Sequence, residues 1–175
     1  MIKIKSDKTI NLKKEIIISI CQLKDSHWKH GLKSQLSHFK KYIKNKDIHN
    51  LLLVKKKIVG YTAFRLRKFR LKNKESKYLL LDTIIVEQKF RKKKYTNSLM
   101  KFNNSFIKKK KLPSFLICTK KNSLFFKKYK WNFLNKRNYN VIGHKKFDVL
   151  MGFNLSRTAF NEKKLSNKVK IFFNK

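Results

Sequence analysis

Residues 79–95 read LLLDTIIVEQKFRKKKY and decide how the rest of the chain is interpreted. The first eight are apolar or β-branched except for one carboxylate, Asp82, in a chain that has only 9 acidic residues. A run this apolar is typical of a strand that is covered on both faces. We therefore predict a central strand over 78–86, followed directly by a basic loop.

The segments before this strand predict a strand, helices and a hairpin. The β-branched run 15–23 predicts a strand. Apolar residues at spacings of three and four predict a helix or a bent helix pair over 28–43, with Asp25 or Ser26 as its cap and Gly31 as its break. Two apolar runs, 51–54 and 58–67, flank a short lysine turn and predict a hairpin, and the polar segment 68–77 predicts a loop.

The segments after the central strand alternate between helix and strand. Helical periodicity follows the basic loop and must end before Pro113, after which SFLIC, residues 114–118, predicts a buried strand. Residues 122–131 predict a short helix capped by Asn122 or Ser123, and residues 147–155 predict a late strand. This order predicts an α/β fold with a mixed central sheet and one strand–helix–strand crossover.

The length of 175 residues predicts one domain with one ordinary core. Residues 1–13 are polar and without pattern, and the last 19 residues look like a basic appendage. We expect an N-terminal extension over 1–14, a folded domain over 15–156 and a basic tail over 157–175.

The formal net charge of +38 indicates affinity for polyanions and raises the hypothesis of nucleic-acid binding. Of the 47 basic residues, 41 are lysine and six are arginine, whereas base and phosphate recognition favours the guanidinium fork. The lysines are also spread along the whole chain beside abundant Asn, Ile and Phe, as an AT-rich coding sequence would produce. Nucleic-acid binding is therefore kept as an alternative that the composition does not favour.

Two cysteines, far apart in apolar runs, predict buried reduced thiols and no disulfide framework. The histidine spacing does not indicate a metal site. No stretch of 18 consecutive apolar residues is present, so we expect no membrane span and a cytoplasmic location. The oligomeric state is not indicated by the sequence.

Residues 86–100, VEQKFRKKKYTNSLM, resemble the central motif of GNAT-superfamily acyltransferases, in which a strand ending in Val runs through R/Q-x-x-G-x-G/A into a helix. The resemblance implies a GNAT-like sheet with helices on both faces, and acetyl-CoA as cofactor. It also implies that a loop at a helix N-terminus binds the pyrophosphate of the cofactor, which matches the donors and partial positive charge of such a terminus. The residues so implied are Arg91, Lys92, Lys93, Lys94, Tyr95 and Thr96.

A second segment, residues 115–131, resembles the family's N-x-x-A-x-x-F-Y helix beside the pantetheine arm, and implies cofactor contacts by Asn122 and Phe125. Both segments depart from the pattern. Lys94 and Thr96 stand at glycine or small-residue positions, and a lysine there weakens close backbone approach to a ligand. Phe126 stands where many members have a tyrosine that protonates the departing thiolate, which leaves Tyr129 as the candidate acid.

The resemblance also assigns roles along the central strand. The backbone of Ile84, Ile85 and Val86 is implied to pair with the pantetheine amides, and the amide near Val86 to hold the thioester oxygen. Asp82 is implied to face the acceptor as its base or anchor; the alternative is a structural ion pair with Arg65 or Arg67 on the neighbouring strand.

The acceptor side of the site is less defined. In family members the first helices and the hairpin border the acceptor cleft, which implicates Trp28, Gln35 and Tyr61. His49 is a second candidate base, acting through a water molecule. We expect an acetyl-CoA-dependent N-acyltransferase that acts on a small amine or amino sugar by direct attack. The alternatives are a basic nucleic-acid-binding protein and a non-catalytic member of the same fold.

Overall fold

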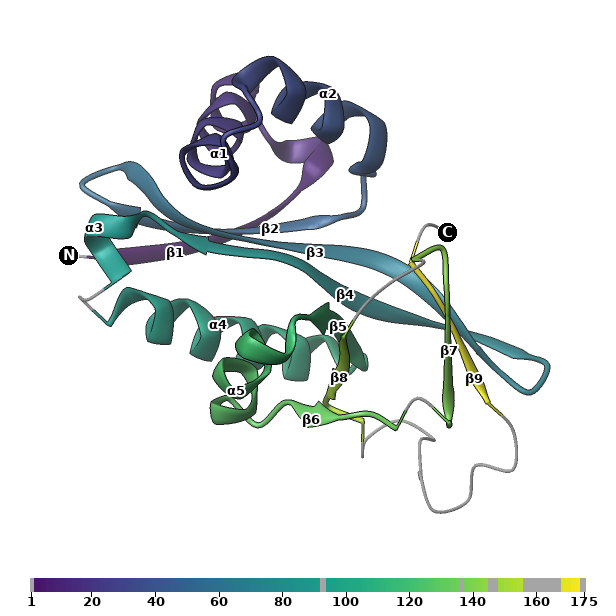
Figure 1. The fold of residues 1–175 in the computed structure, drawn as a ribbon. Coiled ribbons are helices and arrows are strands. Elements are labelled where there is room, and N and C mark those ends of the chain that lie inside the picture. Colours follow the sequence, from purple (N-terminus) through teal and green to yellow (C-terminus); the bar gives the residue numbers. More distant parts are fainter. Residues whose placement is uncertain (1, 92–93, 136, 145–147, 156–167, 174–175) are drawn as a thin grey trace. The chain divides into compact units, whose positions relative to one another are not determined.

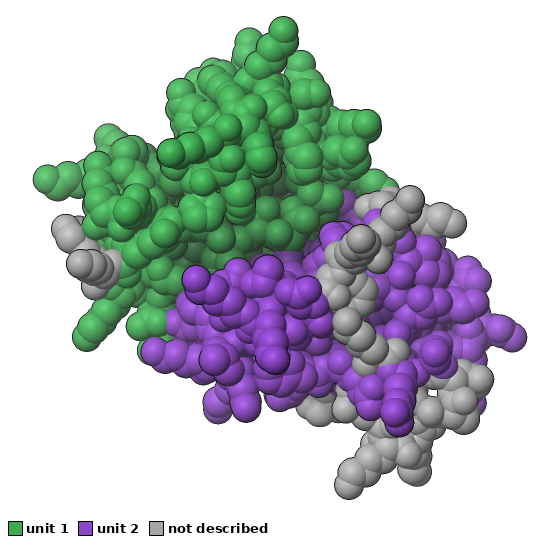
Figure 2. Space-filling view, in the orientation of Figure 1, with its two compact units in different colours: residues 1–65, 82–103 green, residues 66–81, 104–175 purple. Residues whose placement is uncertain are grey.

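The computed structural model describes residues 2–91, 94–135, 137–144, 148–155 and 168–173 (Figure 1). The chain divides into two compact units, which are coloured separately in Figure 2. Unit 1 comprises residues 1–65 and 82–103, and unit 2 comprises residues 66–81 and 104–175. Three elements, β3, β4 and α4, contribute residues to both units.

Unit 1 begins with a strand that the sequence did not indicate. β1 (Ile2–Lys8), placed in the N-terminal extension by the sequence, pairs antiparallel with β2 (Ile48–Val54) along its whole length. β2 pairs antiparallel with β3 (Lys57–Leu71), which confirms the predicted hairpin. The two turn residues between them, Lys55 and Lys56, have φ of 47° and 67°, the positive values that two-residue hairpin loops require.

The predicted strand over 15–23 is wrong, because these residues belong to α1 (Lys14–Trp28). Ile20, Cys21 and Leu23 of α1 are buried in one cluster with Phe39 of α2 and with residues of β2, β3 and β4. Helix formation buries more of this run than a strand would, and tertiary packing thereby overrides the β-propensity of three consecutive isoleucines.

Of the helix or bent helix pair predicted over 28–43, the part after Gly31 is confirmed as α2 (Leu32–Tyr42), whereas α1 ends at Trp28, where the pair was predicted to begin. Gly31 lies between them at φ 83°, a conformation that glycine adopts without strain. Asp25 does not cap a helix start as predicted; it lies in the last turn of α1, and its Oδ1 accepts a hydrogen bond from the Gly31 amide at 2.6 Å.

Helices cover both faces of the sheet in unit 1 (Figure 1). α1 and α2 cover one face, while α3 (Gln88–Arg91) and the first turns of α4 (Tyr95–Lys110) lie on the other. Leu99 of α4 is fully buried against Leu52, Val59 and Val86. Beside it the Asn103 amide nitrogen donates to the Thr62 hydroxyl at 2.9 Å, and its oxygen accepts from Asn50 at 2.8 Å.

The predicted loop over 68–77 is also wrong, because β3 continues to Leu71 and β4 (Lys74–Val86) begins at Lys74. Glu75 lies 2.8 Å from the Lys68 ammonium and 3.4 Å from the Arg70 guanidinium. These charges make the segment polar, yet cross-strand pairs of opposite charge support a strand as well as a loop.

Unit 2 contains the remaining strands and one helix. Its core includes Tyr78, Leu80, Phe115, Leu150 and Ile171. Its elements are β5 (Ser114–Cys118), α5 (Lys120–Lys128), β6 (Asn132–Phe133), β7 (Tyr139–Ile142), β8 (Val149–Phe153) and β9 (Val169–Phe172). The predictions of β5, α5 and β8 are confirmed, with Thr119 as the cap of α5 instead of Asn122 or Ser123. β9 falls in the segment that the sequence assigned to a basic tail, most of which lies outside the described residues.

The described strands pair in the order β1-β2-β3-β4-β5-β8-β6, and β9 pairs with both β3 and β7. Most pairs are antiparallel, whereas β4 with β5 and β7 with β9 are parallel. β4 is therefore central, as the sequence predicted, and the α/β class with a mixed sheet is confirmed. No helix in the described part of the chain is long and apolar enough to cross a membrane.

Candidate active site

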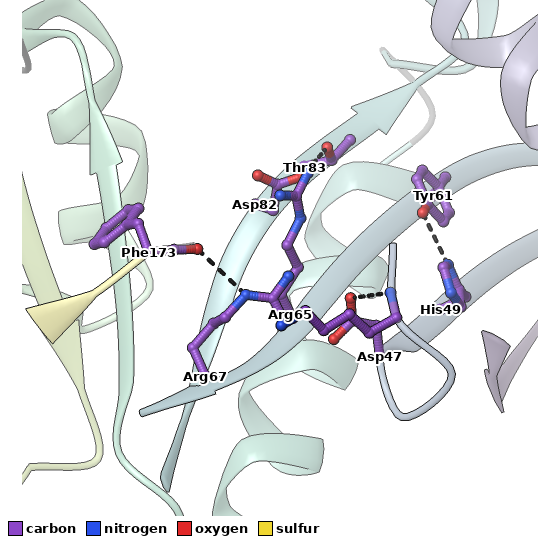
Figure 3. Close-up of polar contacts among 9 residues, drawn as sticks. Asp47, His49, Tyr61, Arg65, Arg67, Asp82, Thr83 and Phe173 are labelled. Atoms are coloured by element: carbon purple, nitrogen blue, oxygen red, sulfur yellow. Dashed lines mark hydrogen bonds and ion pairs between the residues drawn. The ribbon is translucent and has the colours of Figure 1, made fainter. Parts of the chain in front are cut away.

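Asp82, the carboxylate in the apolar part of β4, is paired. Asp82 Oδ2 lies 2.8 Å from a terminal nitrogen of Arg65 on β3 and accepts a hydrogen bond from the Thr83 hydroxyl at 3.2 Å (Figure 3). The Arg65 side chain is 9% exposed and that of Asp82 is 26% exposed. Of the two predicted partners, Arg65 is therefore the one found; the Arg67 Nε donates instead to the Phe173 carbonyl at 3.2 Å, within unit 2.

Asp82 also lines a cavity of about 300 Å³ in unit 1, bounded by α1, α2, β3 and β4. The exposed part of the carboxylate therefore faces a space in which a small molecule fits. Trp28 and Gln35, predicted for the acceptor cleft, line this cavity. The remaining lining residues are Lys24, His30, Ser34, His38, Arg65 and Thr83.

The side chains of β4 do not alternate regularly through the site. Ile84 and Val86 pack in the cluster that contains Leu99 of α4, whereas Ile85 packs with α1 and α2 on the opposite face. Asp82 faces α1 and α2 as well, although it is three residues from Ile85. Strict alternation would place them on opposite faces, so the pleat shifts between them, as it does at a β-bulge. Asp82 therefore lies on the face opposite Ile84 and Val86.

A second cavity of about 700 Å³ lies at the end of β4 in unit 1. Ile85 and Val86 line it, together with residues of α3 and the end of α1. Its charged lining consists of three basic residues, Lys29, Lys89 and Arg91, and one acid, Glu87. The single acid, Glu87, is already paired with Lys57 at 3.1 Å and Lys89 at 3.2 Å, so the cavity favours a negatively charged occupant.

Arg91 holds the end of the strand in place. Its Nε donates to the Val86 carbonyl at 2.9 Å, and a terminal nitrogen lies 3.0 Å from His27 Nδ1. These bonds fix the guanidinium at the wall of the second cavity. The geometry therefore links the first residue of the predicted motif to the last residue of the central strand.

Lys94, at the glycine position of the motif, adopts φ 61°. This is the left-handed conformation that glycine accepts and that a lysine adopts only with strain. α4 begins at the next residue, Tyr95, whose ring stacks on Phe90 at 5.8 Å between centroids, and Thr96 lies in its first turn. Lys92 and Lys93 lie outside the described residues.

The remaining predicted site residues belong to unit 2. Burial raises the pKa of the Tyr129 phenol, which therefore stays protonated at neutral pH. Its ring contacts Phe125 edge-on at 5.1 Å between centroids. Asn122 is exposed in the first turn of α5, where its backbone N–H donates to the Thr119 hydroxyl at 3.4 Å. Phe126, which replaces the expected tyrosine, is buried against Trp131.

His49 and Tyr61 form part of the core of unit 1. His49 Nε2 lies 2.8 Å from the Thr9 hydroxyl. Its Nδ1 lies 2.9 Å from the Tyr61 hydroxyl (Figure 3). Burial lowers the pKa of His49 to about 4, because the charged imidazolium would lose its hydration. Both ring nitrogens are engaged, so the proposed role of His49 as a base through water has no support in this geometry. Tyr61 is buried in the cluster that α1 and α2 form with the sheet, and it does not line the Asp82 cavity.

Sequence reasoning missed Lys24 and His38, which also line the Asp82 cavity. His38 lies within the predicted helix over 28–43 but was not assigned to the site. Lys24 was overlooked because the preceding residues 15–23 were interpreted as a strand, which hides the helical spacing of Lys24 and Trp28. That spacing of four residues places the two side chains on one helix face, and it was the available signal. Within the described ranges, no three His, Cys, Asp or Glu side chains gather as a metal site requires.

No family model and no curated protein sequence matches the chain. Solved structures do match. The GNAT-family N-acetyltransferase YhbS of Escherichia coli, solved with coenzyme A, superposes with a TM-score of 0.64 at 9% identity, over 98% of this chain and 88% of that one. The N-acetyltransferase YlbP of Bacillus subtilis, also in complex with coenzyme A, gives 0.56 at 15% identity, over 87% and 96%.

The ribosomal-protein-S18-alanine N-acetyltransferase of Escherichia coli gives a TM-score of 0.60 at 14% identity, over 87% of this chain and 93% of that one. At these identities the likeness concerns the fold alone. The chain has the fold of the GNAT superfamily of acyltransferases, as its central motif suggested.

Proposed function

We propose that the protein is a coenzyme-A-dependent N-acyltransferase that uses acetyl-CoA and a small amine or amino sugar as acceptor. The observation that carries this proposal is the placement of two cavities along five residues of β4 in unit 1. Asp82 lines the first cavity, and Val86 with Arg91 lines the second. One strand segment thus serves an acceptor at one end and an anionic carrier at the other.

The second cavity supplies what a pyrophosphate requires. Its lining carries three cationic side chains, Lys29, Lys89 and Arg91, and its one acid, Glu87, is already paired. The motif that follows adds the start of α4 with Tyr95 and Thr96, where a helix terminus offers amide donors and partial positive charge. Lys92 and Lys93 are assigned to the same role by resemblance to the family.

The backbone of Ile84, Ile85 and Val86 is assigned to the pantetheine arm. The β4–β5 register in the described chain comprises only Leu79 with Ser114 and Leu80 with Phe115, so it ends before these residues. A strand segment beyond the end of such pairing offers amides and carbonyls to an extended ligand. The amide near Val86 is assigned to the thioester oxygen, which becomes an oxyanion during attack.

In the proposed reaction the neutral amine attacks the thioester carbonyl, the carbon–sulfur bond breaks and an amide forms. Asp82 anchors the amine and accepts its proton, a role for which the Arg65 pair holds the carboxylate in a fixed position. Tyr129, whose phenol remains protonated at neutral pH, is assigned to protonate the departing thiolate. Asn122 and Phe125 are assigned to cofactor contacts by resemblance.

The test compares ligands by thermal unfolding at matched ionic strength. Coenzyme A should raise the melting temperature more than tripolyphosphate does, because it engages the strand as well as the basic cavity. Equal shifts would assign the effect to bulk charge and contradict the proposal. Thiol release from acetyl-CoA in the presence of amines should then be measured; binding without release for any amine would identify a non-catalytic member of this fold.

Asp82→Asn separates the acceptor role from cofactor binding. The amide keeps the shape of the side chain but neither accepts the amine proton nor carries charge, so turnover should fall by about 10²–10⁴-fold. The coenzyme A shift should be retained, which also shows that the variant is folded despite the loss of the Arg65 pair. Unchanged turnover would remove Asp82 from the mechanism.

A further inference from the structure

Lys24 is a buried cation that the proposed reaction does not use. It lies on α1, is 8% exposed and lines the Asp82 cavity. Within the described part of the chain its ammonium has no ion-pair or hydrogen-bond partner, and the one nearby carboxylate is taken by Arg65. A cation in such poorly solvated surroundings is stabilised by a nearby negative charge, so a ligand that supplies one would be favoured at this position.

Other groups in the same wall point to the same chemistry. Arg65 Nε and His38 Nδ1 are buried without a hydrogen-bond partner in the described structure, and both residues line the cavity. Burial lowers the pKa of Lys24; the Asp82 carboxylate opposes this shift, and the Arg65 guanidinium adds to it. Burial likewise lowers the pKa of His38, with Lys24 and Arg65 adding to the shift. The cavity is therefore a cationic environment with one carboxylate in it.

We propose that this cavity binds an acceptor that carries a carboxylate or phosphate beside its amine, with the anionic group held by Lys24 and the amine held by Asp82. This inference rests on the proposed function and narrows its substrate class from small amines to anionic ones. The cavity of about 300 Å³ lies at the low end of the range for ligand pockets, so the occupant is the size of an amino acid or a sugar phosphate.

The site differs from the basic surface that surrounds it. A polyanion meets exposed lysines, which the chain carries along its whole length. Lys24 is largely buried at the wall of the Asp82 cavity, where low solvation strengthens its interaction with an anionic group. Selectivity for a small anionic amine therefore survives salt, whereas bulk attraction is screened.

The experiment is calorimetric titration of the full chain, without coenzyme A, at physiological ionic strength. The probes are two matched pairs, L-alanine with L-alaninamide and glucosamine 6-phosphate with glucosamine. In at least one pair, we expect the member that carries the carboxylate or phosphate to bind 10-fold or more tightly than the member that lacks this group. Lys24→Met should abolish that preference and leave binding of the neutral member unchanged, whereas Lys24→Arg should keep the preference.

Lys14→Met is the matched control, because Lys14 is exposed on the same helix and does not line the cavity. It should keep the full preference for the anionic probes. Equal losses in the Lys24→Met and Lys14→Met variants would overturn the inference, as would the absence of any preference in the wild-type chain. Lys24→Met should fold at least as stably as wild type, because it removes a poorly solvated charge.

A transfer assay separates this inference from the proposed function. Acetylation of glucosamine and glucosamine 6-phosphate with equal kcat/KM, unaffected by Lys24→Met, would overturn the anionic acceptor and leave the acyltransferase intact. Lys24-dependent binding of an anionic probe with no release of thiol from acetyl-CoA would instead support the binding site and contradict the acyltransferase.

Discussion

His49 shows how the core of unit 1 sets the charge of a single residue. Its ring lies between Phe39 and Tyr61, with centroids 5.5 Å and 5.8 Å away, and both nitrogens have partners. Its pKa of about 4 means that the folded chain takes up this proton only in strong acid. The unfolded chain takes it up near pH 6.5, the ordinary value for histidine.

The free energy of unfolding should therefore fall as the pH is lowered from 6.5 to 4. In that window the unfolded state binds one more proton at His49 than the folded state, so the contribution is fully present above pH 6.5 and lost as the pH reaches about 4. The contribution of His49 to this fall in the free energy of unfolding is about 3 kcal/mol. Urea unfolding at several pH values measures it, and the lowered pKa of His38 adds to it in the same direction.

His49→Gln should flatten this pH dependence, because no titrating group remains at the position. His30→Gln is the control, since His30 is exposed on the short link between α1 and α2 and should leave the slope unchanged. If the wild type and the His49→Gln variant lose stability equally between pH 6.5 and 4, the buried neutral histidine is not the cause.

Individual side chains could be predicted where a physical requirement acted on one residue. A carboxylate on an apolar strand needs a partner, which led to Asp82 with Arg65. Trp28 and Gln35 at the Asp82 cavity agree with what the family resemblance implied. Lys24 could not be found in this way, because its burial depends on the packing of α1 against the sheet, and its four-residue spacing from Trp28 is a signal only once that segment is recognised as a helix.

At the level of elements, the backbone of Lys94 is strained at the turn that leads into α4. Its φ of 61° is favourable for glycine, whereas a side chain at this angle crowds the following carbonyl. Lys94→Gly should therefore raise the free energy of unfolding by up to about 1 kcal/mol, after allowing for the greater freedom of glycine in the unfolded chain. Urea denaturation measures this gain.

Lys101→Gly, within α4, is the matched control for Lys94→Gly. Lys101 is exposed within α4 and has helical backbone, so glycine there should lower the free energy of unfolding by about 1 kcal/mol. The two lysine-to-glycine changes remove the same charge and should have opposite signs. A loss of stability in both would show that the left-handed turn before α4 does not strain Lys94.

The elements differ in how far the sequence specified them. The spacing of apolar residues, together with residues that end helices and strands, was sufficient to predict α2, α4, β5 and β8. The lysine turn was sufficient to predict the hairpin of β2 and β3. β1 has alternating lysines and β9 lies in the lysine-rich C-terminal segment, so both read as polar tails; β1 becomes a strand by pairing with β2, and β9 by pairing with β3 and β7. α1 failed because three consecutive isoleucines satisfy either period, and only the partner surface decides between them.

The charge of the whole chain affects its stability as well as its ligands. A formal net charge of +38 on 175 residues means that folding brings like charges together. Raising NaCl from about 20 mM to about 500 mM shortens the screening length from about 20 Å to about 4 Å and weakens this repulsion. Binding to unrelated DNA duplexes should weaken over the same range, as expected for charge without sequence recognition.

The melting temperature should therefore rise by several degrees between these two salt concentrations, because the compact state suffers more from repulsion than the expanded one. Choline chloride at the same ionic strength should give the same rise, which separates screening from binding of sodium. A melting temperature that is constant or falls with salt would mean that the lysines are already spaced beyond each other's influence. In that case the exposed lysines would not oppose folding. Only largely buried cations such as Lys24 would then gain stability from the negative charge of a bound ligand.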